Sequence, residues 1–249
     1  MLDSKKLNQK YYDYYWNDNM VSYLSQSAGT RWFDHLLRRT LAKVDPKTIK
    51  SVVDIGCGVG NKTAMMAEHF KDAQVVGSDF SKPGIEAAKR SHKQKNVRFI
   101  TSDITSEKHK KNYDLITAFD VLEHIEDWQE LTKKLMKVNN KYMLISSPVG
   151  KMRPYEVHIG HVRNFKKREI ETFMESQGYK TVHTYYAGFP FHSPILRNLT
   201  NTFYKDYAEL PQAKMSFLSK RMHDIWYVLF RYFSLKNKGD IFVGLFEKE

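Results

Sequence analysis

The stretch that decides the fold is residues 53–60, which read Val53-Asp54-Ile55-Gly56-Cys57-Gly58-Val59-Gly60. Residues 51–55 form a short, largely β-branched run, as expected of a buried parallel strand. In residues 63–70 the apolar side chains have helical spacing. Glycines between a strand and a helix let the chain turn sharply and let a ligand approach the backbone closely. Residues 53–60 therefore predict a ligand-binding loop at the carboxyl end of a strand.

This loop departs from the dinucleotide-binding pattern, which would place glycine where Asn61 stands. Instead, Asp54 precedes the first glycine and Gly60 follows the second by two positions. A carboxylate at the strand end is unfavourable beside a pyrophosphate but suits a cationic ligand without phosphate. A ligand with an ammonium and a sulfonium group, as in S-adenosylmethionine, has that character.

Strands and helices alternate on both sides of the loop. Further strands are predicted at 73–79, 97–102, 113–119, 142–147, 179–186 and 240–247, with helices at 63–70, 83–91, 128–138 and 166–177. This order predicts an α/β fold with a parallel sheet covered on both faces and ligands at the carboxyl ends of its strands. The last two strands can supply an antiparallel edge.

We interpret the chain, 1–249, as a single domain of four segments. They are an N-terminal helical cap (1–49), a cofactor-binding core (50–187), a helical lid insertion (188–239) and the last strand (240–249). Within the insertion one helical face carries an apolar stripe of Met215, Leu218, Met222, Ile225, Trp226, Leu229, Phe230 and Phe233. We expect this stripe to pack on the domain, with contact to a membrane surface as the alternative.

Two further aspartates follow predicted strands. Asp79 ends the second strand, where a carboxylate can accept both hydroxyls of a ribose, and Asp103 follows the third, where it can accept from an adenine amino group. Each alone could be a loop residue or a helix cap. With Asp54, however, three acids stand at successive strand ends, which favours a functional interpretation.

These residues resemble the class I S-adenosylmethionine-dependent methyltransferases over about residues 50–150, and more loosely to the C-terminus. The resemblance is carried by 53–60, by Gly-Ser-Asp-Phe-Ser at 77–81 and by Phe-Asp-Val-Leu-Glu-His-Ile at 119–125. It implies a doubly wound seven-stranded sheet, mostly parallel, with a reversed last strand. It also implies cofactor contacts from Arg31, Asp54, Gly56, Cys57, Gly58, Gly60, Asp79, Phe80, Ser81, Asp103, Ile104, Phe119, Asp120 and Val121.

Histidines are the candidate general bases, because an imidazole can take the proton of a hydroxyl as its oxygen attacks a methyl group. The candidates are His124, His158 and His161; as alternatives, His158 is a solvated loop residue and His161 fastens the loop. In ubiquinone-type O-methyltransferases an arrangement similar to Asp120, Glu123 and His124 is implicated in binding a divalent metal. The alternative, which we favour, is that Glu123 and His124 cap the following helix.

The chain carries 40 Lys and Arg against 28 Asp and Glu, a formal net charge of +12. A solvated lysine-rich surface explains this excess, but its concentration in 151–169 and 188–239 also allows an anionic acceptor bound by Lys151, Arg153 or Arg163. No nucleic-acid-binding module is recognisable, so DNA is not expected as a partner and RNA is disfavoured. The single cysteine excludes an internal disulfide framework, and the lack of a signal peptide or a long apolar span predicts a cytoplasmic protein.

The sequence thus predicts an enzyme that transfers a methyl group from S-adenosylmethionine to an oxygen of a small metabolite, with nitrogen or carbon as secondary options. The alternatives are an RNA methyltransferase, an enzyme for a lipid-linked acceptor at a membrane surface, and a catalytically silent scaffold. Because Asp54, Asp79 and the loop glycines are all present, the scaffold is disfavoured. The oligomeric state is left open.

Overall fold

The computed structural model of the chain describes residues 12, 13, 15, 16, 18–102, 112–203, 215–235 and 237–249. Asp103 and Ile104, which follow the predicted strand at 97–102, lie outside these residues.

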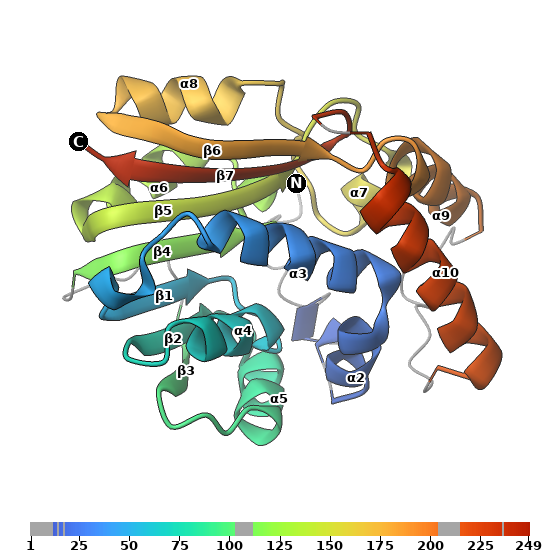
Figure 1. Cartoon of the computed structure of the whole chain (residues 1–249), viewed down its shortest axis with the longest axis horizontal. Helices are drawn as coiled ribbons and strands as arrows, with labels where there is room; N and C mark the ends of the chain where they lie inside the picture. The colour runs from blue at the N-terminus through green and yellow to red at the C-terminus, as the bar shows by residue number, and fades with distance from the viewer. Residues whose placement is uncertain (1–11, 14, 17, 103–111, 204–214, 236) are drawn as a thin grey trace, which may run out of the picture.

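A seven-stranded sheet forms the centre of the molecule, with strand order β3-β2-β1-β4-β5-β7-β6 (Figure 1). The strands are β1 (Ser51–Ile55), β2 (Gln74–Asp79), β3 (Val97–Thr101), β4 (Tyr113–Phe119), β5 (Asn139–Pro148), β6 (Tyr179–Ala187) and β7 (Ile241–Lys248). Strands β1 to β5 pair in parallel, whereas β7 runs antiparallel to both β5 and β6. The predicted mostly parallel sheet with a reversed last strand is confirmed.

Alternate residues of the strands serve two apolar cores, one on each face of the sheet. On one face α6 (Trp128–Lys137) and α8 (Glu169–Ser176) pack on a cluster that includes Ile116, Met143 and Phe242. On the other face α3 (Ala28–Leu41) and α4 (Asn61–His69) pack on a cluster that includes Leu115 and Leu144. Both faces of the central strands are therefore buried, which is why their sequences are continuously apolar.

Local signals fix the starts of several helices. The side chain of Ser81 accepts a hydrogen bond from Gly84 N at the start of α5 (Lys82–Ser91), and Pro83 stands in its first turn. Asp127 caps α6 by accepting from Glu130 N, and Ser27 caps α3 by accepting from Thr30 N. The expectation that Glu123 and His124 cap the helix after β4 is wrong, because Asp127 fills that role.

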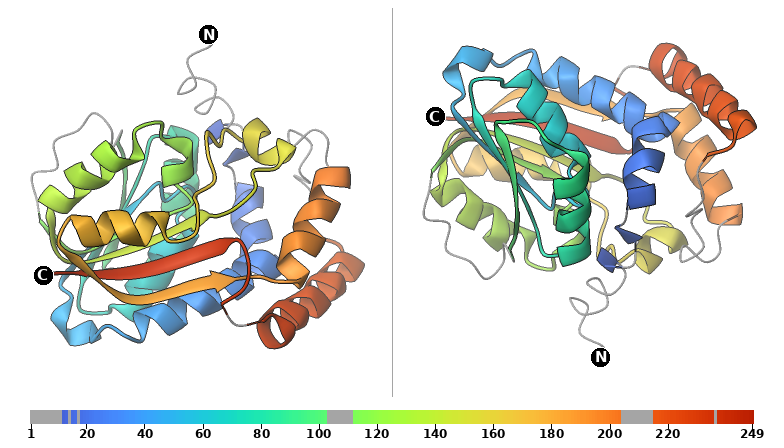
Figure 2. Two further views of the ribbon diagram at one scale, coloured as in Figure 1. Left: turned by 90° about the horizontal axis from the view of Figure 1, so that it is seen from above. Right: turned by 90° about the horizontal axis from the view of Figure 1, so that it is seen from below.

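The remaining helices gather beyond the carboxyl ends of the parallel strands (Figures 1 and 2). They are α2 (Asp18–Gln26), α7 (Pro154–His158), α9 (Arg197–Phe203) and α10 (Phe217–Phe233), with the short helical turns η2 (Leu122–His124) and η3 (Phe191–Leu196); a further turn, η1 (Pro46–Thr48), precedes β1. The helices of this end enclose the edge of the sheet at which the predicted site residues stand. In the described parts of the chain no helix combines the length and apolar character needed to cross a bilayer.

The apolar stripe of the insertion does not pack on the domain as expected. In α10 the packed face consists of His223, Trp226, Tyr227 and Phe230, which contact α3 and η3. Of the stripe, only Phe230 is buried, while Leu218, Met222, Ile225 and Phe233 are exposed. The stripe and the packed face overlap at Trp226 and Phe230 but are rotated relative to each other around the helix axis. The expectation is therefore wrong for four of the eight stripe residues.

Candidate functional site

A cavity of about 1090 Å³ opens at the carboxyl ends of β1, β2 and β4. This volume slightly exceeds the range of about 300–1000 Å³ that ligand pockets occupy. Its walls come from the glycine loop, the aromatic residues at the N-terminus, the segment after β5 and the segment after β6. The cavity has room for a cofactor and an acceptor side by side.

Asp54 stands at the cofactor end of this cavity with only 1% of its surface exposed. Its two carboxylate oxygens accept hydrogen bonds from Thr63 Oγ1 at 2.6 Å and Thr117 Oγ1 at 2.7 Å. Burial outweighs these two hydrogen bonds and raises the pKa of Asp54 to about 6. No cationic side chain bonds to Asp54 among the described residues, because Lys62 pairs with Asp34. A cationic ligand would supply the missing positive charge.

Asp79 organises the glycine loop as well as lining the cavity. Its Oδ2 accepts from Gly58 N and its Oδ1 from Ser81 N, both at 2.8 Å. Gly58 adopts a φ of +52°, and a Cβ there would lie 2.9 Å from the Trp16 ring. Glycine at this position therefore satisfies both the left-handed backbone and the close approach of Trp16.

Most of the predicted cofactor residues meet at one end of the cavity. Those that line it are Asp54, Gly56, Cys57, Asp79, Phe80, Phe119, Asp120 and Val121. Gly58, Gly60 and Ser81 lie behind this lining and shape the loop and the start of α5. For Asp103 and Ile104 the expectation stays a prediction, although the preceding Thr101 and Ser102 line the cavity.

Arg31 bonds to residues of α10. Its Nη1 donates to Asp224 Oδ1 at 2.6 Å, and its guanidinium lies 4.4 Å from the centre of the Tyr227 ring on α10. Arg31 is absent from the cavity lining and forms an ion pair that holds α10 against α3, so its expected contact with the cofactor stays a prediction.

Asp120, the first residue after β4, has a φ of +54°, which is uncommon for a residue other than glycine. Its Oδ1 accepts from Ser146 Oγ at 3.0 Å, and its backbone N donates to Ser146 O at 3.1 Å. These bonds to the end of β5 hold a strained backbone in place. Strain of this kind clusters at functional sites, and Asp120 lines the cavity.

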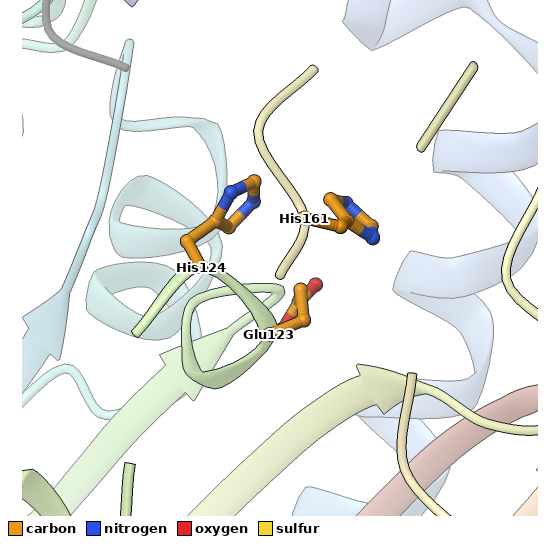
Figure 3. A group of neighbouring side chains, drawn as sticks. All are labelled: Glu123, His124 and His161. Atoms are coloured by element: carbon orange, nitrogen blue, oxygen red, sulfur yellow. The ribbon is translucent and has the colours of Figure 1, made fainter. Parts of the chain in front are cut away.

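Two of the three candidate histidines face each other in the cavity wall, together with Glu123 (Figure 3). The centres of the His124 and His161 rings lie 4.6 Å apart. His124 Nδ1 donates to Gly160 O at 3.1 Å, which leaves the lone pair of Nε2 for the Tyr12 hydroxyl at 3.1 Å. Burial lowers the pKa of His124 to about 4 and that of His161 to about 3, so both rings are neutral at physiological pH.

The third candidate, His158, lies at the end of α7 with an exposed side chain and does not line the cavity. This placement matches the solvated alternative. Of the three candidates, His124 and His161 therefore line the cavity and can reach a ligand in it.

Glu123, His124 and His161 each offer one donor atom within 4.8 Å of the others. Glu123 Oε1 and His161 Nδ1 are buried without a hydrogen-bond partner among the described residues. Two imidazoles and a carboxylate fit a zinc or iron(II) ion better than magnesium. Because Asp120 is not part of this group, the predicted metal set changes to one with His161; metal binding itself stays a prediction.

Glu123 and His124 fasten the segment after β5 instead of capping a helix. Val162 N donates to Glu123 O at 2.9 Å, and the contact from His124 to Gly160 joins the same segment. Ser147 Oγ donates to Glu123 Oε2 at 2.8 Å, which ties the pair to β5. The Glu-His pair thus builds the middle of the cavity wall.

The other end of the cavity is mainly apolar and was not identified from the sequence. Its residues include Trp32, Phe33, Leu196, Ile241 and His192, which lies 5.1 Å from the Trp32 ring. These side chains come from α3, η3 and β7, which are far apart in the chain. No local motif marks them, so only the folded chain brings them together.

One cation, Arg197, lines this end, but its charge is already neutralised. It is 6% exposed, forms ion pairs with Glu156 and with Asp240 at 2.8 Å, and donates from Nε to Tyr155 Oη at 2.8 Å. In the sequence, the one sign that Arg197 is buried is its position in the mainly apolar stretch 189–199.

The basic residues expected to bind an anionic acceptor are not in the cavity lining. Arg153 pairs with Asp240 at 3.1 Å, Arg163 donates to Glu126 O, and Lys151 is exposed. Lining carboxylates outnumber lining cations: Asp54, Asp79, Asp120, Glu123, Glu126, Asp127 and Glu156 stand against Lys62 and Arg197. Acceptor contacts from these three residues therefore stay a prediction, and the acidic lining suits cationic and neutral ligands better than anionic ones.

Comparison with known proteins identifies relatives of this fold and site. A family described as "Methyltransferase domain" matches residues 47–205. Trans-aconitate 2-methyltransferase of Escherichia coli is 27% identical over 222 residues, which covers 82% of this chain and 86% of that protein.

Solved structures share the fold at lower identity. Phosphoethanolamine N-methyltransferase 2 of Haemonchus contortus, in complex with S-adenosyl-L-methionine, has a TM-score of 0.59 at 21% identity and is matched over 85% of this chain and 51% of that one. Magnesium protoporphyrin IX methyltransferase of Synechocystis, with the same cofactor bound, has a TM-score of 0.55 at 20% identity over 74% of this chain and 90% of that one.

Proposed function

Because the chain belongs to the methyltransferase domain family and is an S-adenosylmethionine-dependent enzyme, we propose that it methylates an oxygen of a small, mainly apolar acceptor. The observation that carries this proposal is the two-ended cavity. One end presents the buried carboxylates of Asp54 and Asp79, and the other presents Trp32, Leu196 and Ile241 around a neutralised arginine. The neutral imidazole of His124 also lines the cavity.

The carboxylates fit the cofactor. Asp54 is a buried anion without a bonded cation, and Asp79 has hydrogen-bonding capacity left after its two backbone bonds. They would hold the ammonium and the ribose, respectively. When bound, the cofactor supplies a methyl group on a positively charged sulfur.

His124 would position the acceptor hydroxyl. Its Nδ1 is fixed as a donor by Gly160 O, so its Nε2 can accept from the acceptor hydroxyl in place of Tyr12. As the oxygen forms its bond to the methyl carbon, the carbon–sulfur bond breaks and the hydroxyl proton passes to Nε2. A weak base is sufficient for this step, because an oxygen that is being methylated becomes strongly acidic. Much of the rate enhancement then comes from in-line positioning.

The relatives named trans-aconitate 2-methyltransferase act on a carboxylate-rich molecule, as their name states. In this chain Arg153 and Arg197 are occupied by Asp240 and Glu156. We therefore propose an acceptor with less negative charge than trans-aconitate. An alcohol or phenol on an apolar skeleton fits the lining.

The test combines calorimetry with kinetics. We expect S-adenosylmethionine to bind the wild type and binding to be lost in Asp79→Ala. With an acceptor found by screening neutral alcohols and phenols, His124→Gln should lower kcat by about 10²–10⁴-fold. The matched variant His158→Gln should leave kcat unchanged, because His158 lies outside the cavity.

Two results would contradict this proposal. One is turnover restricted to di- or tricarboxylates, which would reject the apolar acceptor. The other is full kcat in His124→Gln, which would remove His124 from the reaction. Loss of activity after treatment with a chelator, restored by zinc or iron(II), would assign the Glu123, His124 and His161 group to a metal instead.

A further inference from the structure

Helix α10 lies at the outer end of the molecule (Figures 1 and 2) and presents an apolar face to solvent. Leu218 is 71% exposed, Ile225 62% and Tyr232 66%. We call this surface the outer face of α10, which consists of Phe217, Leu218, Met222, Ile225, Val228, Tyr232 and Phe233. Such a concentration of exposed large apolar side chains on one helix marks an interaction surface.

The opposite face of α10 fixes this orientation. Phe230 is fully buried against Trp32, with ring centres 5.7 Å apart. His223 Nδ1 accepts from Ala28 N at 3.1 Å, and Asp224 pairs with Arg31 at 2.6 Å. Because these contacts lie on α3, the outer face cannot turn inward without breaking them.

The charges of α10 are of one sign where they are exposed. Lys220, Arg221 and Arg231 are exposed, whereas the single acid of α10, Asp224, is half-buried and pairs with Arg31 at 2.6 Å and with Arg221 at 3.5 Å. An amphipathic helix with aromatic and aliphatic residues on one side and basic residues among and beside them is typical of helices that lie in a bilayer interface. The long side chains of such bases can reach the headgroups while their stems stay in the apolar layer.

We propose that α10 docks on the surface of an anionic lipid bilayer, with the side chains of its outer face inserted among the acyl chains. At about 1.5 Å per residue its 17 residues would lie along roughly 25 Å of the surface. A second copy of the chain fits the outer face less well. A symmetric pairing would bring two sets of three basic residues, Lys220, Arg221 and Arg231, together against one acid per helix, Asp224, which already pairs with Arg31 and Arg221.

This docking would place the apolar end of the cavity near the lipid. Helix α10 packs on α3 and η3, which supply Trp32, His192 and Leu196 to that end. An apolar acceptor could then enter from the bilayer. The docking itself goes beyond the proposed function and does not depend on which atom is methylated.

The test is co-sedimentation of the full chain with vesicles of phosphatidylcholine, with and without phosphatidylglycerol. We expect binding to the anionic vesicles that weakens with salt, and a loss of at least about tenfold in a Leu218→Glu, Ile225→Glu double variant. Val157→Glu is the matched control, because Val157 is 55% exposed on α7, away from α10, and should bind like the wild type. Arg221→Glu should weaken binding to anionic vesicles by about fivefold or more, since each basic residue contributes about 1 kcal/mol at such a surface.

Calorimetric titration with S-adenosylmethionine separates this proposal from the proposed function. All variants should keep the cofactor affinity of the wild type, because none of the changed residues lines the cavity. Failure of the wild type to sediment with anionic vesicles would overturn the docking, as would undiminished sedimentation of the double variant. A dimer in light scattering that the double variant abolishes, without vesicle binding by the wild type, would assign the outer face to a second copy.

Discussion

Replacing Asp54 by asparagine should stabilise the ligand-free protein while weakening the cofactor site. Burial raises the pKa of this carboxyl from 3.8 to about 6, so its ionised form is less favourable in the folded protein than in the unfolded chain. A group with a raised folded pKa costs stability as pH rises through the interval between the two values, and the full cost remains above it. The pH window is therefore about 4 to 6.

The size of the effect follows from the shift. Two pKa units and a fraction correspond to about 3 kcal/mol at pH 7.5, and to about half of that at pH 5. The amide would leave part of its hydrogen-bonding capacity unmatched beside Thr63 and Thr117, which removes part of the gain. We expect Asp54→Asn to raise the free energy of unfolding by about 1–3 kcal/mol at pH 7.5, or Tm by about 3–9 °C.

The same change should reduce the affinity for S-adenosylmethionine by about 10–100-fold, the effect of losing one charged hydrogen-bond partner. In the wild type, affinity should also decline as pH falls through about 6, because the cation binds the ionised carboxylate. Thermal unfolding at pH 5 and 7.5, together with calorimetric titration of the cofactor across this range, measures both effects.

Asp114→Asn is the matched control, because it makes the same chemical change at the start of β4, away from the cavity. Burial there is outweighed by hydrogen bonds from Lys50 N, Ser51 N and Asn140, so the pKa of Asp114 is lowered. Its stabilising contribution is present above its unfolded pKa and lost in acid. Asp114→Asn should therefore destabilise the protein at pH 7.5. A lower Tm in Asp54→Asn at pH 7.5, or a gain that grows toward pH 5, would refute the reasoning.

Two further outcomes test the geometry of the site. Gly58→Ala should abolish cofactor binding in a chain that still folds, because the new Cβ would meet the Trp16 ring and alanine would have to adopt a left-handed backbone conformation. Calorimetric titration measures the binding and circular dichroism checks the fold. An unchanged affinity would contradict the loop geometry. Arg197→Met should lower the free energy of unfolding by about 3–5 kcal/mol, since it leaves Glu156 and Asp240 as buried acids with fewer partners. Denaturant unfolding measures this loss. A loss below about 1 kcal/mol would show that the ion pairs contribute little.

The sequence predicted the framework because its signals are local. The strands at 51–55 and 113–119 have the predicted bounds, β2, β3 and β6 differ from theirs by one residue at one end, and β7 differs by one residue at both ends. β5 is longer at both ends, since Asn139 pairs with Tyr113 of β4 and Pro148 pairs with Ile241 of β7. Unbroken apolar β-branched runs ended by glycine or aspartate specify buried parallel strands without reference to the rest of the chain. Asp54 and Asp79 could be placed for the same reason, since each stands at the end of such a strand.

Partners that are distant in the chain could not be predicted in this way. Arg31 pairs with Asp224, which is 193 positions away, and His161 reaches His124 only because Gly160 bonds across the cavity wall. Helical spacing in the insertion predicted an apolar stripe but not which side of α10 would face α3. Which side of α10 faces α3 depends on the contacts of Ala28 with His223 and of Phe230 with Trp32.

The sequence by itself therefore determined the alternating α/β framework, the glycine loop and the acids at the strand ends, because short-range patterns specify strands, turns and the residues that end them. The tertiary structure alone decided which histidines face the cavity, that its acceptor end is apolar with a neutralised arginine, and that α10 exposes its apolar side chains. Those features depend on contacts between segments separated by many residues, and such contacts exist only when the whole sheet and its helices have packed together.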